Sequence, residues 1–479
     1  MLVAAAVLSL AQACATNYGQ FHPQAMSWLA LALLCTVAAW VRLSRMPAMP
    51  LAETAAARRV ELVLWTSAIL LQGILLLARD PLLPASAADG TQFGIRIAVV
   101  AVMFCAAAGI LLPAAYRKLC LVGMLAAYGV AGLLVLRGYP TPGVDVIVFQ
   151  RDASDALLTG RSPYSITFPD ISPAGSDFYA PGTSVGGRLQ FGFPYPPLSL
   201  LLILPFHLLG DFRLAGLIAT IVAAGLIASI RRSPRAIAAA ALFLLTPMGF
   251  FVVWAGWTEP LAVMLLAGVL FAASRERRGK VGDIHPVAGW PLIVALSLLI
   301  AVKQYFVLLL PLAMLLIPAG SRAKSLVRIL LFAAAISLPL VLADIGGFFH
   351  SVVFLQFRQP YRGDALSFLA PLHGWLPQPA AGALPFALLT LAMTLCIRTA
   401  QRSTAAFSLA SSLCLLVFFA FNKQAFCNYY HLVEGALAGA LATCGAASPQ
   451  SADTDLDRRI CTRNQTSTAQ ASAPIAAAS

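Results

Sequence analysis

The residues best placed to do chemistry begin with a carboxylate, Asp145, near the start of the longest polar stretch of the chain, residues 137–195. This stretch follows an apolar run, 119–136, so Asp145 lies just beyond a segment that could cross a membrane. Burial at such a junction, together with neighbouring arginines, can tune the pKa of a carboxyl group for general base catalysis. The alternative is an ordinary interfacial aspartate that pairs with Arg137 or Arg151.

Two further charged residues lie between or beside apolar runs. Lys303 separates two such runs, and its ammonium group can either contact a phosphate or extend along its stem to the membrane interface. Glu259 follows two tryptophans, which are common at membrane interfaces. It can either bind an acceptor or cap a helix that starts at Pro260. The sequence leaves both pairs of alternatives open.

Two later polar segments contain candidate anion-binding residues. In the segment 347–380, Arg358 and Arg362 have the planar donors that grip a phosphate in bidentate fashion. The alternative is that they pair with Asp364. A second segment, 421–431, either closes a cavity over a lipid head group or forms an interfacial belt. Its polar residues are Lys423, Asn428, Tyr430 and His431.

The elements that must position these residues are apolar helices. The chain has 479 residues, of which 60% are hydrophobic and 11% charged, whereas soluble domains are roughly one-quarter charged. This composition argues against a water-soluble enzyme and against a disordered protein. About 20 apolar residues span the bilayer core, where a helix satisfies its own backbone. The clearest apolar runs are 27–42, 60–78, 95–115, 119–136, 214–230, 236–256, 258–274, 326–346, 381–397, 405–421 and 430–447.

Three apolar segments are less regular. Residues 288–318 are expected to form two short helices with a bend at Lys303-Gln304. Residues 196–210 begin with two prolines and are expected to form a partial helix, re-entrant or interfacial. Residues 1–15 are expected to be a retained first helix, and a cleaved signal segment is the open alternative.

Basic residues gather in alternate connections, and this bias predicts orientation because Lys and Arg favour the cytoplasmic side. If residues 196–230 make one net crossing, all of the basic clusters fall on that side. The formal net charge of +13 is then an orientation signal, and no nucleic-acid partner is expected. The other, nearly neutral side collects the loops 137–195 and 347–380. The tail, 448–479, is expected to be disordered and cytoplasmic.

The long loop has internal order. Residues 144–160 place apolar side chains at helical spacing and end at Gly160, so we expect a helix that lies along the membrane interface. Structureless loops longer than about 15 residues are uncommon unless they are functional or disordered. This loop is rich in aromatic residues, proline and glycine. We therefore expect it to fold onto the membrane surface and line a site.

Three motifs of this region form a recognisable pattern: Asp-Val-Ile-Val-Phe-Gln at 145–150, Leu-Leu-Thr-Gly-Arg-Ser-Pro-Tyr at 157–164 and Phe-Pro-Tyr-Pro-Pro-Leu at 193–198. The pattern resembles the first outer loop of the polytopic C-superfamily (GT-C) glycosyltransferases. The likeness is greatest to the polyprenyl-phosphate-mannose-dependent mannosyltransferases of glycosyltransferase family 87. Gly-Trp-Thr-Glu (256–259) and Ala-Val-Lys-Gln (301–304) resemble later outer-side elements of such enzymes.

The sequence departs from the family pattern at two places. Val146 stands where the family more often has an aromatic residue after the aspartate, and residues 170–190 form an insertion. Both departures leave the sugar and the acceptor open.

The resemblance implies an all-α polytopic membrane protein with a GT-C-like bundle of roughly 12–14 transmembrane helices. It implies transfer of a sugar from a polyprenyl-phosphate carrier to an acceptor hydroxyl at the outer leaflet, with inversion and with Asp145 as general base. Cations must stabilise the phosphate that leaves. The expected donor phosphate-binding residues are Lys303, Arg358, Arg362 and Lys423. The expected acceptor- or sugar-binding residues are Arg151, Tyr164, Tyr195, Glu259, Gln304 and His431.

The expected organisation is N-terminal helices 1–136, an outer catalytic loop 137–195, a helical core 196–447 and the tail 448–479. The expected partners are a polyprenyl-phosphate-linked, mannose-like sugar donor, a glycan or glycolipid acceptor and the lipid bilayer. The expected location is a cell membrane, a bacterial inner membrane with the site on its outer side. Cysteine and histidine spacings are not those of metal ligands, so neither a metal nor a cofactor is expected.

The competing function is that of a transporter or flippase for a lipid-linked or small-molecule substrate. Transporters often contain internal repeats and broken helices with charges near the membrane midplane. No clear repeat stands out in this sequence, and its polar residues gather at one predicted face.

Overall fold

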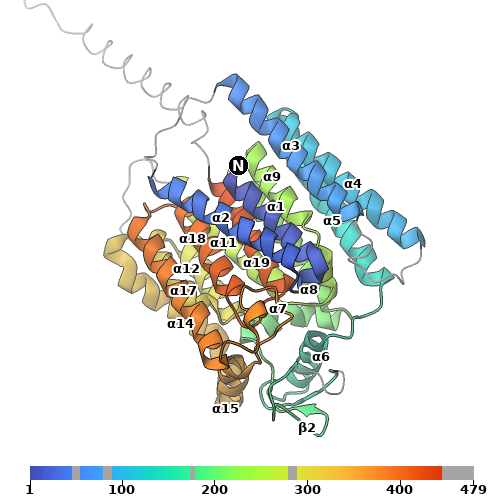
Figure 1. Ribbon diagram of the computed structural model, residues 1–479, viewed down its shortest axis with the longest axis vertical. Coiled ribbons are helices and arrows are strands. Elements are labelled where there is room, and N and C mark those ends of the chain that lie inside the picture. The colour runs from blue at the N-terminus through green and yellow to red at the C-terminus, as the bar shows by residue number, and fades with distance from the viewer. Residues whose placement is uncertain (46–53, 79–88, 173–177, 279–287, 445–479) are drawn as a thin grey trace, which may run out of the picture.

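The computed structural model describes residues 1–45, 54–78, 89–172, 178–278 and 288–444. Across these residues the chain is a bundle of α-helices with one small three-stranded sheet (Figure 1). The expected all-α architecture is therefore confirmed. The tail, predicted to be disordered, lies outside the described residues.

Seven helical segments among the described residues are long and apolar enough to cross a membrane, and the number rises to eight if a bent pair counts as one span. Continuous apolar sequence explains their length, because a helix leaves no backbone group exposed to lipid. The chain therefore has the character of a multi-pass membrane protein. The helices are α1 (Leu2–Ala15) with η1 (Thr16–Gly19), α2 (Pro23–Arg45), α3 (Ala55–Ala78), α4 (Asp89–Leu111), α5 (Arg117–Gly138) with η2 (Ala114–Tyr116), α14 (Arg322–Ala343) with η4 (Ala319–Ser321), and α17 (Gln378–Thr399).

The remaining helices of the bundle are shorter, and several are interrupted. α7 (Pro197–Leu208) meets α8 (Arg213–Ser229) at a bend of 113°, so the predicted partial helix is one arm of a bent pair. α12 (Trp290–Val302) ends before Lys303 and the chain continues as α13 (Phe306–Leu309) and η3 (Leu310–Leu315), which confirms the predicted bend. The expected total of roughly 12–14 spans depends on such short helices and stays a prediction.

One predicted span is broken. The apolar run 236–256 predicts a single crossing, but α9 (Pro234–Leu244) ends and α10 (Gly249–Trp254) begins after a turn. Pro247 lies in this turn, and proline lacks the amide hydrogen and clashes with the preceding helical turn. The prediction of one continuous helix was wrong, because apolar composition indicates burial and does not indicate continuity.

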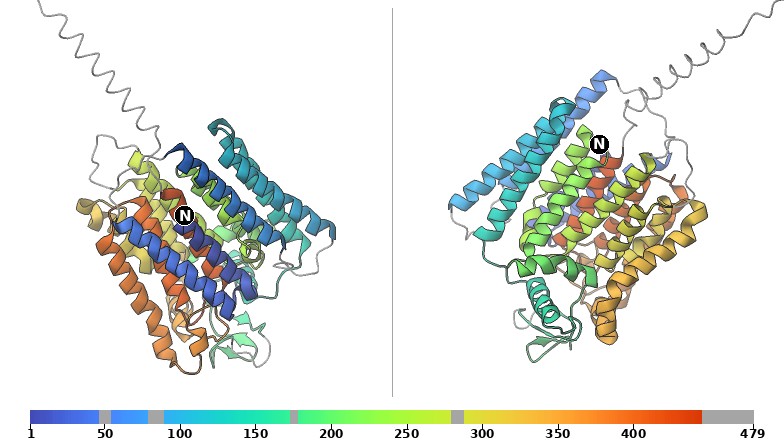
Figure 2. Two further views of the ribbon diagram at one scale, coloured as in Figure 1. Left: turned by 45° about the horizontal axis from the view of Figure 1, so that its top comes forward. Right: turned by 180° about the vertical axis from the view of Figure 1, so that it is seen from behind.

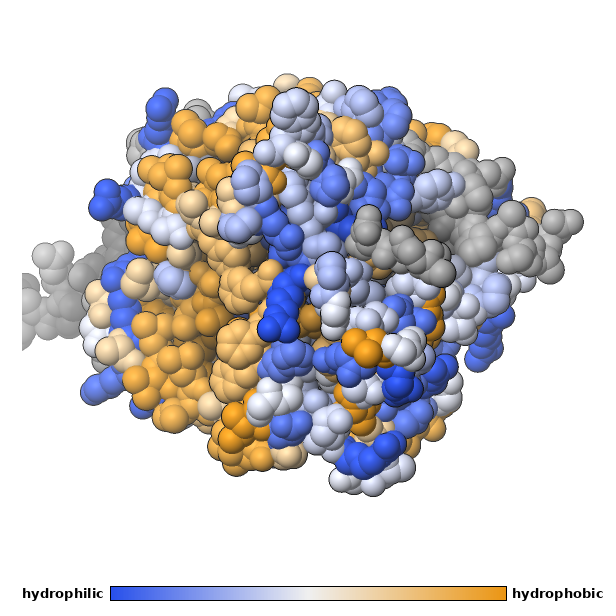
Figure 3. Space-filling model, turned by 60° about the horizontal axis from the view of Figure 1, so that its bottom comes forward, coloured by the Kyte–Doolittle hydropathy of each residue, from blue (hydrophilic) through white to orange (hydrophobic). Residues whose placement is uncertain are grey.

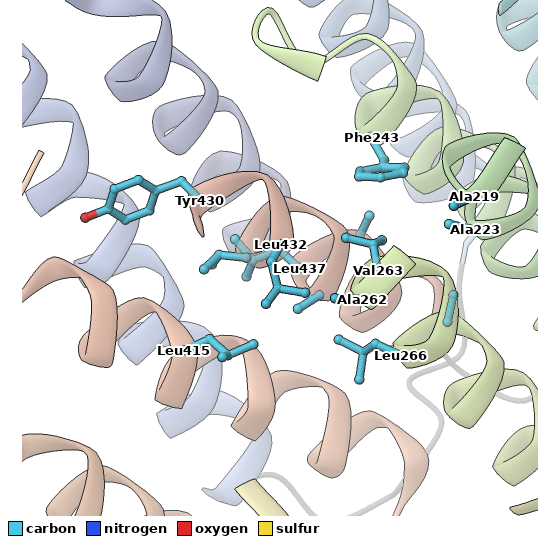
Figure 4. Packing of buried hydrophobic residues seen from close by; sticks show 14 of the residues in the cluster. Ala219, Ala223, Phe243, Ala262, Val263, Leu266, Leu415, Tyr430, Leu432 and Leu437 are labelled. Atoms are coloured by element: carbon cyan, nitrogen blue, oxygen red, sulfur yellow. The ribbon is translucent and has the colours of Figure 1, made fainter. Parts of the chain in front are cut away.

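The centre of the bundle is α19 (Cys427–Thr443), which is buried along almost its whole length. It packs against α1, α9, α11 (Glu259–Arg278) and α18 (Thr404–Ala420). Figure 4 shows apolar side chains of α11, α18 and α19 meeting in this core. The helices approach closely because small residues allow it: a Cβ atom on Gly435 would lie 2.3 Å from a methyl group of Val263.

Basic residues gather at one end of the bundle. The guanidinium group of Arg235, at the start of α9, donates to Glu61 of α3 and to the carbonyl of Cys444 at 2.6 Å. The charges of Arg235, Glu61 and Arg42 all act on the amino terminus. The ends of α2, α3, α9 and α19 thus meet where the sequence predicts a basic face. The assignment of this face to the cytoplasm stays a prediction.

The opposite end carries the long loop. Here α6 (Asp145–Leu158) lies beside β1 (Phe168–Pro169), β2 (Ser184–Val185) and β3 (Arg188–Leu189), which pair antiparallel in the order β1-β3-β2 (Figures 1 and 2). A second group of short elements lies at this end: α15 (Ile345–Phe348), η5 (Phe349–Phe354), α16 (Leu355–Arg358) and η6 (Ala370–Leu372). Seen from this end, hydrophilic and apolar residues occupy separate areas of the surface (Figure 3). We call this the outer end, after its predicted side.

The predicted interfacial helix is α6, and it stops where the sequence places its stop. Gly160 adopts a φ of +74°, which glycine tolerates without steric cost. The N–H of Arg161 donates to the carbonyl of Ala156 at 2.8 Å, and the N–H of Gly160 donates to that of Leu157 at 3.1 Å. This pair of bonds is a Schellman motif, which ends the helix cleanly.

Candidate functional site

Asp145 is the first residue of α6 and both of its carboxylate oxygens are hydrogen-bonded. Oδ1 accepts from the backbone N–H of Val146 at 2.7 Å, and Oδ2 accepts from the hydroxyl of Tyr179 at 2.5 Å. Burial raises the pKa of the carboxyl group above its ordinary value, while these two hydrogen bonds and the charge of Arg362 limit the rise. The predicted alternative partners, Arg137 and Arg151, form no ion pair with Asp145.

Packing and one amide hold α6 in place. Phe149 contacts Phe168 and Phe191, with ring centroids 4.8 and 5.6 Å apart. The side-chain amide of Gln150, which is buried, donates to the carbonyl of Gly256 at 2.5 Å. This bond ties the helix that begins with Asp145 to the turn that leads into Glu259.

The predicted motifs Pro-Tyr and Pro-Tyr-Pro-Pro meet. The hydroxyl of Tyr164, a buried residue, donates to the carbonyl of Tyr195 at 3.0 Å. The N–H of Phe193 donates to the carbonyl of Pro163 at 2.9 Å. Through these bonds each motif holds the backbone of the other, and Tyr195 is thereby fixed just before the start of α7.

Lys303 is buried in an ion pair. Its ammonium group donates to Glu259 Oε1 at 2.9 Å and to the hydroxyl of Thr258, and it lies 4.3 Å from the ring centroid of Tyr195. The side chain of Lys303 is 5% exposed and that of Glu259 is 0% exposed, so the lysine does not reach out to the interface. The helix break after α12 and the start of α11 bring the two charges together.

These residues form one neighbourhood. Burial raises the pKa of the Tyr195 hydroxyl, and the negative charges of Glu259 and Asp145 both add to the rise. Tyr195 therefore lies within electrostatic reach of both carboxylates and directly over the ammonium group of Lys303. We call the set Asp145, Tyr179, Tyr195, Glu259 and Lys303 the outer polar cluster.

The cluster and the two residues that follow Lys303 contain hydrogen-bonding atoms without a protein partner among the described residues. Glu259 Oε2, Gln304 Oε1 and the hydroxyl of Tyr305 are buried and unpaired among the described residues. Such atoms are costly to bury. Aromatic rings of Tyr195, Tyr305 and Phe419 line the same region, with Tyr305 and Phe419 centroids 5.5 Å apart. An arrangement of free acceptor oxygens beside aromatic faces suits a ligand with hydroxyl groups.

The two arginines predicted to bind phosphate in the loop 347–380 have different surroundings. Arg362 pairs with Asp364 at 2.5 Å, the alternative foreseen for it, and its guanidinium group also stacks on Phe178 and Phe426 at 4.3 and 5.2 Å. The charge of Arg362 nevertheless acts on Asp145. Arg358 is exposed and forms no ion pair with the described residues.

Lys423 is held by the neighbouring loop. Its ammonium group donates to the carbonyls of Phe357 at 3.0 Å and Gln359 at 2.5 Å, which leaves one of its three N–H bonds. Burial lowers the pKa of this ammonium group to about 8. Backbone bonds join the same segments, since the N–H of Arg362 donates to the carbonyl of Lys423 at 3.0 Å.

Two predicted site residues lie elsewhere. Arg151 is exposed and pairs with its neighbour Asp152 at 2.9 Å, away from the cluster. His431 is buried in α19, where its Nδ1 lies 3.8 Å from Glu434 Oε2 and its ring lies 5.0 Å from that of Phe243. We call His431 and Glu434 the core pair. The structure therefore separates His431 from Lys423, which the sequence placed on one surface.

Other residues of the site were not predicted. Tyr179, Thr258 and Tyr305 contact or border the predicted charges, and Gln150 positions them. The signal for Tyr305 and Thr258 was adjacency to Gln304 and Glu259. Tyr179 belongs to the insertion 170–190, and no spacing rule connects it to Asp145. Among the described residues, no group of three or more His, Cys, Asp or Glu side chains could hold a metal ion.

Comparison with known proteins adds little. No family model matches the sequence, and no curated protein matches it. Among solved structures, the chain is similar to ArnT from Cupriavidus metallidurans bound to undecaprenyl phosphate, with 16% sequence identity and a TM-score of 0.46. The match covers 73% of this chain and spans 64% of that protein. Similarity at this level establishes neither a shared fold nor a shared activity.

Proposed function

We propose that this chain is a GT-C glycosyltransferase that moves a sugar from a polyprenyl-phosphate carrier to an acceptor hydroxyl, with Asp145 as the general base. One observation carries the proposal: Tyr195 connects a carboxylate of raised pKa with a buried cation. The charge of Asp145 acts on the Tyr195 hydroxyl, and the ammonium group of Lys303 lies 4.3 Å from the centroid of the same ring. Sugar transfer from a phosphate carrier needs a base that accepts the proton of the acceptor hydroxyl and a cation that stabilises the phosphate that leaves.

The chemistry follows from these positions. The acceptor oxygen attacks the anomeric carbon, its proton passes to Asp145, and the bond between the sugar and the phosphate oxygen breaks. The electron pair of that bond leaves with the polyprenyl phosphate, and a single attack on the face opposite the leaving group inverts the anomeric carbon. Lys303 and Lys423 are the buried cations that can stabilise the leaving phosphate, with Arg358 and Arg362 as further contacts.

The finer assignments are part of the same proposal. The sugar is mannose-like, as in glycosyltransferase family 87, and Tyr164, Tyr195, Glu259 and Gln304 position it or the acceptor. The free acceptor oxygens of Glu259 and Gln304 support this role because sugar hydroxyl groups donate hydrogen bonds. The site faces the outer side of a bacterial cell membrane, because the basic connections gather at the other end of the bundle. Arg151 and His431 have no support from their positions.

Purified protein tests the base assignment. Undecaprenyl-phosphate mannose is supplied in detergent, and release of undecaprenyl phosphate is followed for the wild type and for Asp145→Asn. The matched control is Asp155→Asn on the same helix, whose carboxylate pairs with His207 at 2.8 Å and is 56% exposed. Turnover in the wild type and the control but not in Asp145→Asn supports the assignment. Wild-type turnover by Asp145→Asn would refute it.

A transporter is the second candidate, and the core pair is the observation that favours it. Ionisable residues buried in a helical bundle often mark the path of an ion or a substrate. An enzyme consumes the lipid-linked sugar in detergent, whereas a transporter moves its substrate across sealed vesicles without bond cleavage. The two assays therefore distinguish the candidates.

A further inference from the structure

The hydroxyl of Tyr179 occupies the position that a reacting alcohol needs. A general base must lie within hydrogen-bond distance of the proton that it removes. In this structure Oδ1 of Asp145 accepts from the backbone N–H of Val146, and Oδ2 accepts from the Tyr179 O–H at 2.5 Å, so Tyr179 supplies the one side-chain donor that the structure shows on this carboxylate. A water or alcohol that approaches Oδ2 along this direction must take the place of the Tyr179 hydroxyl.

Tyr179 is held at this position from two sides. Its ring contacts Phe191, with centroids 6.0 Å apart, and Phe191 belongs to the aromatic group that packs on α6. The preceding residue, Phe178, lies 4.3 Å from the guanidinium carbon of Arg362. Arg362 is itself fixed by Asp364 and by a backbone bond to Lys423. The dipeptide Phe178-Tyr179 therefore connects the two polar loops over the cluster.

The phenol is a donor and not a competing base. Burial raises the pKa of the Tyr179 hydroxyl, and the charge of Asp145 and the hydrogen bond to it raise the pKa further. The proton therefore stays on Tyr179 at neutral pH. The contact is a neutral hydroxyl group bound to a carboxylate, which is the same pairing that an acceptor hydroxyl would make.

We propose that Tyr179 caps the general base against water and is displaced by the acceptor hydroxyl, so that the lipid-linked sugar is transferred and not hydrolysed. The proposal rests on the function proposed above. In hydrolysis, water would attack the anomeric carbon, its proton would pass to Asp145, and the polyprenyl phosphate would leave. An acceptor bound by its own sugar or lipid contacts can displace the phenol, whereas a single water molecule brings no such binding energy.

The variant Tyr179→Phe keeps the ring and removes the cap. Hydrolysis of undecaprenyl-phosphate mannose without an acceptor is expected to rise about ten- to hundredfold, since a hydrogen bond to a charged group has that worth in equilibrium terms. The control is Tyr116→Phe, because Tyr116 is 54% exposed and lies at the opposite end of the bundle. Transfer to octyl mannoside, a probe alcohol, measures how much transfer the variant retains. Unchanged or slower hydrolysis in Tyr179→Phe would overturn the proposal.

A second readout does not depend on the donor. Asp145 is labelled with a water-soluble carbodiimide and glycine ethyl ester, and the tagged fraction is measured by peptide mass spectrometry. Faster labelling in Tyr179→Phe than in the wild type and Tyr116→Phe supports the cap, and equal labelling refutes it. The two proposals fail in different ways. Full turnover by Asp145→Asn refutes the proposal that Asp145 is the base. An inactive Asp145→Asn together with unchanged hydrolysis in Tyr179→Phe refutes only the proposal that Tyr179 caps the base.

Discussion

The outer polar cluster and the core pair both bury a carboxylate next to a basic group, but their geometry differs. Lys303 Nζ lies 2.9 Å from Glu259 Oε1 and also donates to Thr258, whereas His431 Nδ1 lies 3.8 Å from Glu434 Oε2. The first pair joins a helix break to a helix start, and the second lies on one continuous helix at i and i+3. Residues at the ends of different helices can approach to hydrogen-bond distance. Residues at i and i+3 of one regular helix are held about one turn apart.

The difference teaches where chemistry can occur in this bundle. At interrupted helices the backbone leaves room for side chains of several elements to meet, and in the described chain this happens at the outer end. Burial alone is a poor guide, because both pairs are almost fully enclosed. Four predictions test whether only the outer polar cluster is functional.

The largest effect is expected at Asp145. Asp145→Asn should lower transfer about 10²- to 10⁴-fold, the usual contribution of a general base, while Glu434→Gln in the core pair should leave the rate within about threefold. The wild-type rate should fall as pH drops through the raised pKa of Asp145, because only the carboxylate accepts a proton. Initial rates across pH measure both effects. An equal loss of rate in Glu434→Gln would contradict this prediction, because the core pair would then also be functional, as the transporter candidate requires.

Stability should distinguish the two pairs next. Lys303→Met leaves the Glu259 carboxylate buried without its cation and should cost about 3–5 kcal/mol of stability, and the double variant Lys303→Met, Glu259→Leu should recover most of it. Glu434→Gln should change stability by no more than about 1 kcal/mol, since the amide oxygen can still accept from Thr246 and the nearest histidine nitrogen is 3.8 Å away. Thermal unfolding in detergent reports the order of the variants. If Glu434→Gln lowered stability as much as Lys303→Met does, the interaction within the core pair would be as strong as that between Lys303 and Glu259.

A third prediction compares two buried amides, Gln150 beside the outer polar cluster and Gln72 in the core. Gln150→Leu leaves the carbonyl of Gly256 without its donor and should cost about 1–3 kcal/mol. The turn before Glu259 should loosen, so transfer should fall more than in Gln72→Leu, which removes a comparable buried amide bond to Leu242 in the core. Rates and melting temperatures of both variants are compared. Equal losses of rate would show that Gln150 only supports the fold.

The smallest expected effect concerns Lys423. Its ammonium group has a pKa of about 8, so it loses its charge as pH rises through that value. If the ammonium group binds the donor phosphate, the KM for the donor should rise about tenfold between pH 7 and pH 9, as the charged fraction falls. Lys423→Gln should abolish this dependence. A KM that rises equally in the variant would assign the effect to another group.

The sequence predicts the helices well, because apolar length and turn residues are local signals. The stop at Gly160, the bend at Lys303-Gln304 and the short helix after Pro196-Pro197 all appear where the sequence places them. The missed break at Pro247 also had a local signal, which the apolar run obscured. Such features depend on a few neighbouring residues, so one sequence suffices to find them.

The site is only partly predictable, because its contacts join distant residues. Lys303 and Glu259 were each predicted as site residues, but no spacing indicated that they pair. Tyr179 lies 34 residues from its partner, and its segment departs from the family pattern. His431 was misplaced because α19 begins at Cys427 and turns the histidine into the bundle. Helix start and helix face must both be known before such a residue can be placed.

The connection between α1 and α2 has a consequence for how the protein is made. The N–H of Phe21 donates to the carbonyl of Asp364 at 2.9 Å, Gln20 forms a β-bridge with Ala365, and the hydroxyl of Tyr430 donates to Leu366. The first helical hairpin, a late loop and the last described helix are therefore fastened together. Chains are synthesised from the N-terminus at about 5–20 residues per second, so the early hairpin waits roughly 20–70 s for this partner. During that interval residues 20 and 21 lack these partners, so the outer end of the early hairpin reaches its final packing only after the late loop has been made.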